Sequence, residues 1–331
     1  MIEVLKSSPF VTLQDLGRVG WRNIGIGTAG AMDWFALRTG NAILGNSPNA
    51  AGIEITASRF HLRFERDTAI AVTGADGRAK LSGLDLPPLW ATNVKAGDEL
   101  VTHPPRTGGM RTYLCIAGGI DTPSVLGSRS TDIKSGFGGY HGRSLLAGDR
   151  LPLGEGNPVR LPDGGFGAKP FLSTETAEGV TIFNVIPAAE AGLLTKQAIQ
   201  TFWSTDWTVS PDNNRMGLRL TGPQLAFSEK LELLSHPILP GVIQVPPSGQ
   251  PIIQAADANT CGGYPKAGVI VGAHVWQLGQ LRTGARLRFR QTTQEAAVAL
   301  TREIERYLER LARYAAMVCG KLPANSTRSD S

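Results

Sequence analysis

Two segments of the chain carry residue types that bind and activate small polar molecules. The first is Gly127-Ser-Arg-Ser-Thr-Asp132, in which small hydroxyls flank an arginine and glycine lets the backbone approach a ligand. Amide N–H groups and a forked guanidinium in such a loop bind carboxylates or phosphates. The same residues are equally consistent with a hairpin whose hydroxyls satisfy the turn backbone, and the sequence favours neither interpretation.

The second segment runs from Gln244 to Lys266 and is rich in glycine and proline. Two amides, a carboxylate, a hydroxyl, a phenol and an amine occur within it. Loops with this density of polar groups usually line a binding site. The polar residues are Gln244, Gln250, Asp257, Thr260, Tyr264 and Lys266.

Other motifs favour structural interpretations. The run Gly25-Ile-Gly27-Thr-Ala-Gly30 matches a dinucleotide fingerprint, but no buried strand ends at its first glycine. We interpret it as a loop that leads into a helix. Cys261 has no neighbouring base in sequence and is predicted to be a small packed residue. His141 and His274 are interpreted as ordinary hydrogen-bonded histidines.

The composition indicates many short strands joined by tight turns. The chain has 331 residues, of which 40 are Gly and 21 Pro, while 41% are apolar and 18% charged. The net charge of +5 comes from scattered residues, which argues against nucleic-acid binding. The five histidines and three cysteines lie far apart, so neither a metal site nor a disulfide framework is predicted. No leader-like or membrane-spanning run is found, and a cytoplasmic location is predicted.

Strands alternate with only a few helices. A helix is predicted over 34–44, with Asp33 as N-cap and Gly45 as the stop, and another from Pro187 to Phe202. The third begins at a capping box, Thr292-x-x-Glu295, and has one apolar face. Ten strands are predicted at 60–64, 69–73, 98–102, 111–117, 179–186, 208–210, 242–245, 252–255, 267–271 and 285–289.

The Gly/Pro-rich stretch from Gly154 to Pro170 predicts a boundary between two lobes. We expect an N-terminal β lobe over 1–160 and a C-terminal β lobe over 171–290. A terminal helix over 291–320 and a disordered tail over 321–331 follow.

A set of motifs in one order resembles the biotin-dependent carboxyltransferase-like family, also called the allophanate hydrolase subunit 2 family. The resemblance covers about residues 3 to 290. Its motifs include Gln14-Asp-Leu-Gly-Arg18, Gly30-Ala-Met-Asp33, Glu54-Ile-Thr, Leu126-Gly-Ser-Arg-Ser-Thr-Asp132, Gly138-Gly-Tyr-His-Gly-Arg143, Asn214-Arg-Met-Gly-Leu-Arg-Leu-Thr-Gly-Pro223, Gln244-Val-Pro-Pro-Ser-Gly-Gln-Pro251 and Gly262-Gly-Tyr-Pro-Lys266.

The resemblance implies a mainly β fold with two cyclophilin-like β-barrel lobes. It also implies the role of the C subunit in a bacterial ATP-dependent 5-oxoprolinase, which opens 5-oxoproline to glutamate. The implied partners are a kinase-inhibitor-like B subunit and an A subunit that is a lactam-utilisation protein, and the chain alone is expected to be inactive. ATP with Mg is implied as co-substrate of the complex, with no tightly bound cofactor.

Both the lactam reaction and the related urea reaction develop charge on a carbonyl oxygen, which calls for oriented donors and a nearby cation. Arg129, Lys266 and Arg215 are hypothesised to supply positive charge, and Asp257 to act as general base or magnesium ligand. The remaining candidates are Tyr264 as a catalytic donor and Ser128, Ser130, Thr131, Gln244, Gln250, Thr260, Gly262 and Gly263 as binding residues.

Two positions depart from the family pattern and leave alternatives open. Cys261 stands where the family usually has Thr, and His274 where it usually has Asp. One alternative is a non-catalytic regulatory binder of a kinase-inhibitor-like partner. The other is a carboxyltransferase lobe of a urea carboxylase-type biotin enzyme, with biotin carrier and ATP-grasp segments on another chain.

Overall fold

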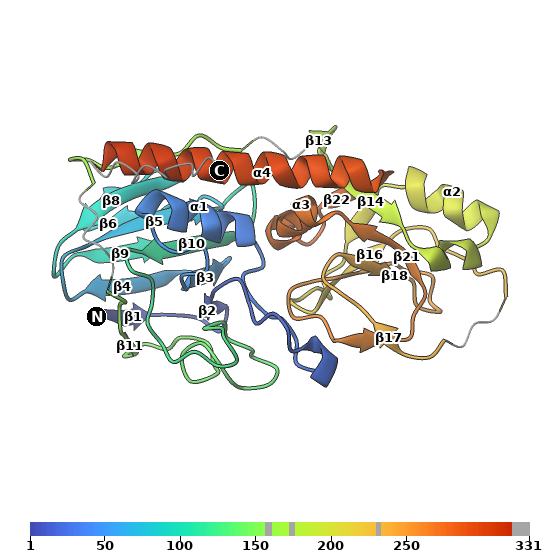
Figure 1. Cartoon of the computed structure of the whole chain (residues 1–331), viewed down its shortest axis with the longest axis horizontal. Coiled ribbons are helices and arrows are strands. Elements are labelled where there is room, and N and C mark those ends of the chain that lie inside the picture. Colours follow the sequence, from blue (N-terminus) through green and yellow to red (C-terminus); the bar gives the residue numbers. More distant parts are fainter. Residues whose placement is uncertain (156–160, 172–175, 230–232, 320–331) are drawn as a thin grey trace, which may run out of the picture.

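The computed structural model describes residues 1–155, 161–171, 176–229 and 233–319. Two β-rich lobes lie side by side, and the last helix runs along both of them (Figure 1). We call the sheets formed by residues 2–167 the N lobe and the sheet formed by residues 176–291 the C lobe. The predicted class is thereby confirmed: mainly β and barrel-containing, with few helices. The predicted tail lies outside the described residues, and the exact domain limits stay predictions.

The N lobe contains two six-stranded sheets with a shared apolar core between them. Their orders are β11-β1-β4-β9-β6-β7 and β12-β8-β5-β10-β3-β2. The first consists of β1 (Ile2–Lys6), β4 (Phe60–Phe64), β6 (Lys80–Leu81), β7 (Leu84–Asp85), β9 (Glu99–Thr102) and β11 (Arg150–Leu151). The second consists of β2 (Val11–Gln14), β3 (Gly52–Thr56), β5 (Thr68–Gly74), β8 (Trp90–Val94), β10 (Arg111–Ile116) and β12 (Phe166–Gly167).

Strand β10 lies inside the second sheet and is buried along its whole length. One face packs into the core between the sheets, and the other is covered by α1 (Trp34–Leu44). Helix α1 begins and ends as predicted: the Asp33 carboxylate accepts from the Ala36 N–H at 2.8 Å, and Gly45 has a φ of 65°. The well-capped helix fixes the segment just before it, which carries part of the candidate site.

The C lobe is a sheet that closes on itself. Its order is β13-β14-β21-β18-β19-β16-β15-β22, and β14 also pairs in parallel with β22, which completes the ring. Buried and exposed residues alternate along β16 and β22, as expected where one strand face fills a barrel. The strands are β13 (Thr176–Ala177), β14 (Val180–Pro187), β15 (Trp207–Val209), β16 (Gly217–Thr221), β18 (Val242–Gln244), β19 (Ile252–Gln254), β21 (Lys266–Ile270) and β22 (Arg286–Gln291). A separate pair, β17 (His236–Pro237) and β20 (Cys261–Gly262), lies outside the barrel.

The helix predicted from Pro187 to Phe202 is wrong in its first half. Strand β14 includes Pro187, a short 3-10 turn η2 (Ala189–Leu193) follows, and α2 (Lys196–Ser204) begins only after Thr195. The Thr195 hydroxyl accepts from the Ala198 N–H at 3.1 Å and is the true N-cap. The apolar spacing that suggested one helix spans two elements. The remaining short helical segments are η1 (Arg22–Ile24), α3 (Gly272–Val275) and η3 (Trp276–Gln280).

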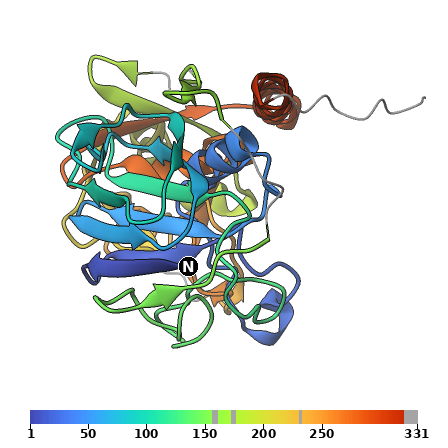
Figure 2. The same ribbon diagram turned by 90° about the vertical axis from the view of Figure 1, so that its left-hand side faces the viewer.

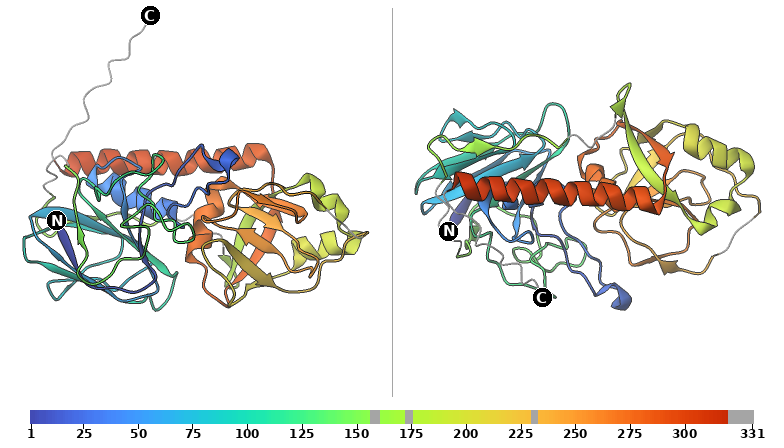
Figure 3. Two further views of the ribbon diagram at one scale, coloured as in Figure 1. Left: turned by 90° about the horizontal axis from the view of Figure 1, so that it is seen from below. Right: turned by 45° about the horizontal axis from the view of Figure 1, so that its top comes forward.

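Helix α4 (Gln294–Val318) connects the two lobes. Thr293, rather than the predicted Thr292, is its N-cap, because the Thr293 hydroxyl accepts from the Ala296 N–H at 3.3 Å. Ile304 and Leu308 pack against α3 of the C lobe and Phe35 of α1, whereas Leu311 packs into the core beneath α1. Seen from the end of the N lobe, α4 is viewed down its axis beside α1 (Figure 2). Two further views show it spanning both lobes (Figure 3).

Among the described residues, no helix has the length and apolar character needed to cross a membrane.

Candidate functional site

The two lobes meet through a buried network of charged side chains. Glu54 of β3 is at its centre: the Arg215 Nη1 atom lies 2.6 Å from Glu54 Oε1, and the Tyr113 hydroxyl donates to Oε2 at 2.6 Å. Arg215 precedes β16 and therefore belongs to the C lobe. Its guanidinium also donates to both carboxylate oxygens of Asp257, at 2.8 and 2.9 Å, and to the Gly30 carbonyl at 2.6 Å. One arginine thus joins a strand of the N lobe to a loop of the C lobe.

Burial and charge act in opposition on the ionisable groups of this network. Burial favours the neutral form of Glu54, but the Arg215 and Arg111 guanidinium groups outweigh it and hold its pKa below the usual value. Burial raises the pKa of Asp257 and outweighs the bidentate contact with Arg215, and the nearby negative charges of Glu54 and Asp132 act in the same direction as burial. The pKa of Arg215 is raised, since the two carboxylates more than offset the effect of burial. Asp257 is therefore the carboxyl of this network whose proton affinity is increased.

Asp33 lies at the edge of the same junction. Its carboxylate caps α1 and accepts from Gln280 Nε2 of the C lobe at 2.6 Å, while its own N–H donates to the Tyr113 hydroxyl at 2.8 Å. Burial raises the pKa of Asp33 to about 7, against the opposing effect of the Gln280 and Ala36 hydrogen bonds. The carboxyl that begins α1 is thus tied to both lobes and titrates near neutral pH.

A polar cleft of about 230 Å³ opens beside Asp257, between the two lobes. The N lobe contributes two loops, and the C lobe contributes the segment after β19. Lys134 Nζ donates to Asn259 Oδ1 at 2.7 Å across the cleft, and Arg22 donates to the Asn259 carbonyl at 2.9 Å. Its polar lining residues are Asp132, Lys134, Ser135, Asp257, Asn259 and Thr260. This cleft places a carboxyl of raised pKa beside a hydroxyl and an ammonium group.

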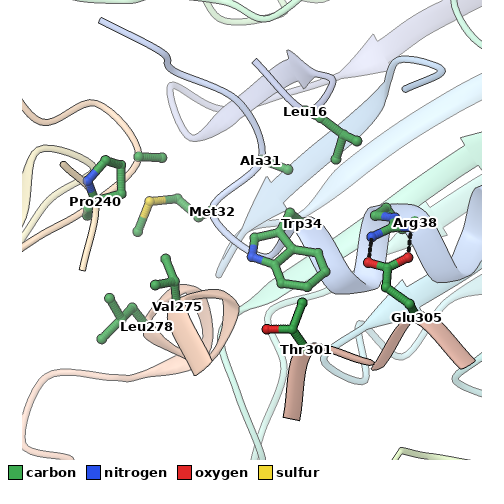
Figure 4. A pocket seen from close by; sticks show the side chains of 12 residues that line it. Leu16, Ala31, Met32, Trp34, Arg38, Pro240, Val275, Leu278, Thr301 and Glu305 are labelled. Atoms are coloured by element: carbon green, nitrogen blue, oxygen red, sulfur yellow. Dashed lines mark hydrogen bonds and ion pairs between the residues drawn. The ribbon is translucent and has the colours of Figure 1, made fainter. Parts of the chain in front are cut away.

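A second cavity, of about 390 Å³, is mainly apolar and is lined in part by neighbours of the same two segments. Ala31 and Ala256 line it, directly after the Gly30 and directly before the Asp257 of the junction. Figure 4 shows Trp34 and Met32 facing Val275 and Leu278 of the C lobe, with the Arg38–Glu305 ion pair at one end. The junction therefore separates a polar compartment from an apolar one.

The polar side chains of the first predicted segment, Gly127 to Asp132, form most of their hydrogen bonds within the N lobe. Ser128, Ser130 and Thr131 are buried, and the Ser128 and Ser130 hydroxyls donate to Asp15 Oδ1 at 2.7 and 2.6 Å. The Thr131 hydroxyl donates to the Leu13 carbonyl at 3.0 Å. Arg129 donates to Asp121 Oδ1 at 2.7 Å and to the Thr122 carbonyl at 2.8 Å. These hydroxyls donate to Asp15 and Leu13, which are distant in sequence, rather than to the backbone of their own turn, and a ligand-binding role for this segment stays a prediction.

The second predicted segment is divided between the cleft and a neighbouring cluster. Asp257 and Thr260 line the cleft, and Arg215 supports it from behind. Gln244 lies opposite Lys266 in the pairing of β18 with β21, and Lys266 Nζ lies 3.4 Å from Glu190 Oε1.

The remaining predicted residues of the second segment lie apart from the cleft. The Gln250 side-chain amide accepts from the Gly222 N–H and donates to the Gly222 carbonyl, so both of its polar atoms are paired with backbone. Tyr264 is exposed, and Gly262 and Gly263 contribute backbone beside Gln244 and Leu233. A role of these residues in binding stays a prediction.

One prediction about single residues is wrong. Cys261, predicted to be packed, is exposed and lines the cleft, because β20 pairs only with the short β17 and nothing covers its outer face among the described residues. His274 is buried and accepts from the Asn184 N–H at 3.2 Å, which agrees with a hydrogen-bonded core histidine. The two departures from the family pattern therefore differ: one changes the cleft and the other the interior.

Several residues that build the junction were missed as functional candidates. Glu54, Arg111 and Asp33 were not singled out for chemistry, although Glu54 and Asp33 belong to quoted motifs. The available signal was a carboxylate inside an otherwise apolar strand, Gly52-Ile-Glu-Ile-Thr56. A charge in such a position must meet an opposite charge, but the sequence does not say which one.

The cleft does not fit a magnesium ion held by the protein alone. Both oxygens of Asp257 already accept from Arg215, and Asp132 accepts from the Ser135 N–H at 2.9 Å. The described residues contain no group of three His, Cys, Asp or Glu side chains placed to hold a metal. The hypothesis that Asp257 binds magnesium directly is therefore not supported by its contacts.

Comparison with known proteins identifies relatives over nearly the whole chain. Residues 24–291 match the family described as "Carboxyltransferase domain, subdomain A and B". The C subunit of 5-oxoprolinase from Escherichia coli (strain K12) is 39% identical over 94% of this chain and 98% of its own length. The protein of the same name from Haemophilus influenzae is 37% identical over 95% of this chain and 98% of its own length.

The fold is similar to part of a much larger enzyme. The crystal structure of the Kluyveromyces lactis urea amidolyase matches with a TM-score of 0.84 at 29% identity. The match covers 94% of this chain but 20% of that one.

Proposed function

Because the chain belongs to the family of carboxyltransferase domains with subdomains A and B, we propose that it is the C subunit of a 5-oxoprolinase. The observation that carries the proposal is the end-to-end similarity to two bacterial proteins of that name, each matched over 98% of its length. The proposed reaction is the ATP-dependent hydrolysis of 5-oxoproline to glutamate. The chain then acts as one component of a multi-subunit hydrolase.

Within that complex we propose that the polar cleft handles the lactam. Asp257 has a raised pKa and lies beside Thr260 and Lys134, so it is suited to accept a proton as water or a lactam nitrogen reacts. Lys134 offers an ammonium group for a substrate carboxylate or phosphate. Arg215, already paired with Glu54 and Asp257, acts as a positioning residue that orients the Asp257 carboxyl.

The other predicted residues enter the proposal with narrower roles. Gln244 and Lys266 lie on neighbouring strands of the C lobe, and the buried Gln244 amide donates to the carbonyl of the exposed Tyr264. Arg129 is partly exposed beside Asp121 at the rim of the N lobe. We place these residues where the kinase-inhibitor-like B subunit meets the chain or where nucleotide approaches. ATP with magnesium, and the lactam-utilisation protein that forms the A subunit, complete the proposed assembly.

The test is ADP release that depends on 5-oxoproline, measured with the chain mixed with its B and A partners. Asp257→Asn should lower turnover by about 100-fold or more, as expected for loss of a general base. Asp85→Asn, at an exposed ion pair with Lys80 outside the cleft, is the matched control and should retain turnover. Lys266→Ala should cost at least about tenfold if a charged hydrogen bond is lost.

Other outcomes would redirect the proposal. Tight complex formation with no turnover of 5-oxoproline would favour a regulatory binding module. Turnover that requires biotin and urea instead would favour the carboxyltransferase alternative, which the match to the urea amidolyase structure brings into consideration. Normal turnover of Asp257→Asn in an active complex would remove the cleft from the reaction, while the proposed membership of a 5-oxoprolinase complex would stand.

A further inference from the structure

A third cavity, of about 620 Å³, lies between the lobes and shares no lining residue with either compartment described above. The N lobe contributes the Gly108–Gly109 loop, and the C lobe contributes the segment from Trp276 to Ala285 together with Gly179 and Thr181 of the β13–β14 hairpin. Its size falls in the range of small-molecule binding sites. No residue of the proposed reaction lines it.

A buried carboxamide with no partner lies in the wall of this cavity. Gln277 is 3% exposed, and neither its Nε2 nor its Oε1 has a hydrogen-bond partner among the described residues. The indole Nε1 of the adjacent Trp276, which also lines the cavity, is likewise without one. Each buried polar group left unpaired costs about 1–3 kcal/mol, so such groups in a native protein call for an explanation.

The neighbouring glutamine shows that this segment can satisfy an amide. Gln280 Oε1 accepts from the Met110 and Arg111 N–H groups, both at 2.9 Å. Its Nε2 donates to the Arg111 carbonyl at 3.0 Å and to Asp33. The Gln280 carboxamide has hydrogen-bond partners at both its oxygen and its nitrogen, whereas the Gln277 carboxamide, three residues away, has none among the described residues. The unpaired state of Gln277 is therefore not a general property of this turn.

We propose that the cavity is a binding site for a planar cis-amide, such as a lactam, an imide or a ureide, recognised by Gln277. A carboxamide presents one donor and one acceptor side by side, and its complement is an N–H and a C=O on the same edge of a ligand. A carboxylate or an ester matches only half of this pattern. Gln277 lines the cavity but its two amide atoms are buried, so binding requires the side chain to turn toward the ligand, a change of rotamer of the kind that is common on binding.

Trp276 provides a second hydrogen-bond donor beside Gln277. Its indole N–H can donate to another acceptor of the ligand, while its ring packs against Phe35 with centroids 5.0 Å apart and is held in place. The cavity, at about 620 Å³, has room for a ligand that carries further groups beside the cis-amide. Glycines at the rim, with φ of 130° at Gly109 and 81° at Gly284, keep the opening free of side chains.

The test uses the isolated full chain and two matched probes, 2-pyrrolidone and N-methyl-2-pyrrolidone. The two share ring and carbonyl, and only the first has the N–H that pairs with Gln277 Oε1. Titrations are followed by the nitrogen-15 NMR signals of the Gln277 side-chain amide and the Trp276 indole. Saturable shifts in the millimolar range are expected for 2-pyrrolidone, which has about six heavy atoms. The N-methyl compound should bind at least about tenfold more weakly, as for one lost buried hydrogen bond.

A variant separates recognition from structure. Gln277→Met removes the unpaired amide at similar volume, so the ligand-free variant should melt at the same temperature as the parent or higher, and the discrimination between the probes should disappear. Gln197→Met, at an exposed glutamine of α2, controls for the substitution itself and should keep the discrimination.

Either of two results overturns the proposal. One is equal affinity of the parent protein for the two probes or no saturable shift with either. The other is a Gln277→Met variant that melts lower yet still prefers 2-pyrrolidone. These measurements require neither ATP nor partner proteins, so they do not depend on the proposed function.

Discussion

Replacing Glu54 with glutamine tests whether the buried ion network joins the lobes. Glu54 is 1% exposed and receives hydrogen bonds from Arg215, Tyr113 and the Met32 N–H. Glutamine has nearly the same shape but lacks the negative charge. Arg215 would keep Asp257 as its only carboxylate partner, and Arg111 would lose the Glu54 carboxylate 3.5 Å from its Nε.

The expected loss of stability is large. Removing one partner of a buried ion pair costs about 3–5 kcal/mol, because the remaining charge stays buried. Tyr113→Phe, which removes one hydrogen bond to the charged Glu54, should cost about 1.5–3 kcal/mol. Since domains are stable by about 5–15 kcal/mol, Glu54→Gln should shift the unfolding transition clearly.

The assay is urea unfolding followed by circular dichroism and by tryptophan fluorescence. Arg215→Met and the double variant with Glu54→Gln complete a double-mutant cycle. The two residues are in direct contact, so the double variant should lose at least about 1.5 kcal/mol less than the sum of the single variants. If the two probes report separate transitions in Glu54→Gln, the lobes have been uncoupled.

The control is Lys95→Ala, which breaks an exposed ion pair with Asp67 and should leave the transition unchanged. A Glu54→Gln variant within about 1 kcal/mol of the parent, or a cycle whose free energies simply add, would refute the idea that this network holds the lobes together.

Three further experiments test other parts of the structure. The pKa of Asp33 is about 7 in the fold and about 4 in an unfolded chain, so its stabilising contribution is complete below pH 4 and is lost as pH rises toward 7. The free energy of unfolding of Asp33→Asn, measured relative to the parent, should therefore rise by about 2–4 kcal/mol from pH 4 to 8. A difference between the two proteins that does not change with pH would contradict this. Gly17→Ala should be more destabilising than Gly20→Ala. Both glycines have a positive φ, but only at Gly17 would the added Cβ meet backbone, 2.6 Å from the Thr28 carbonyl oxygen. Equal melting temperatures of the two variants would argue against this contact. Ile304→Ala should lower the free energy of unfolding in urea by about 2–5 kcal/mol, whereas Val298→Ala on the exposed side of α4 should lower it much less. Similar losses of stability in the two variants would mean that α4 does not pack as described.

Much of the fold could be predicted because local patterns agree with it. The strand periods, the Asp33 and Gly45 limits of α1 and the apolar face of α4 depend on residues close in sequence. The error at Pro187 arose where tertiary contacts decided: β14 extends through Pro187 because it pairs with Gly268 of β21. Local spacing of apolar residues does not contain that information.

The candidate site could be predicted only in part. Asp257 and Thr260 were found because polar residues in a Gly/Pro-rich loop mark a site by composition. Glu54 could not be assigned a role, since its partner Arg215 is 161 positions away and in the other lobe. The inward orientation of Ser128 follows from Asp15, which is 113 positions away in the sequence.

The course of helix α4 has a consequence for how the protein is made. Leu311 and Ala315 of α4 complete an apolar cluster that α1 forms with residues of β5, β8 and β10. On the ribosome the strands of the N lobe are synthesised first, but that cluster lacks Leu311 and Ala315 until α4 (Gln294–Val318) has been translated. The side of α1 that packs against α4 therefore stays exposed until α4 leaves the ribosome. During this interval the nascent chain is most prone to aggregate.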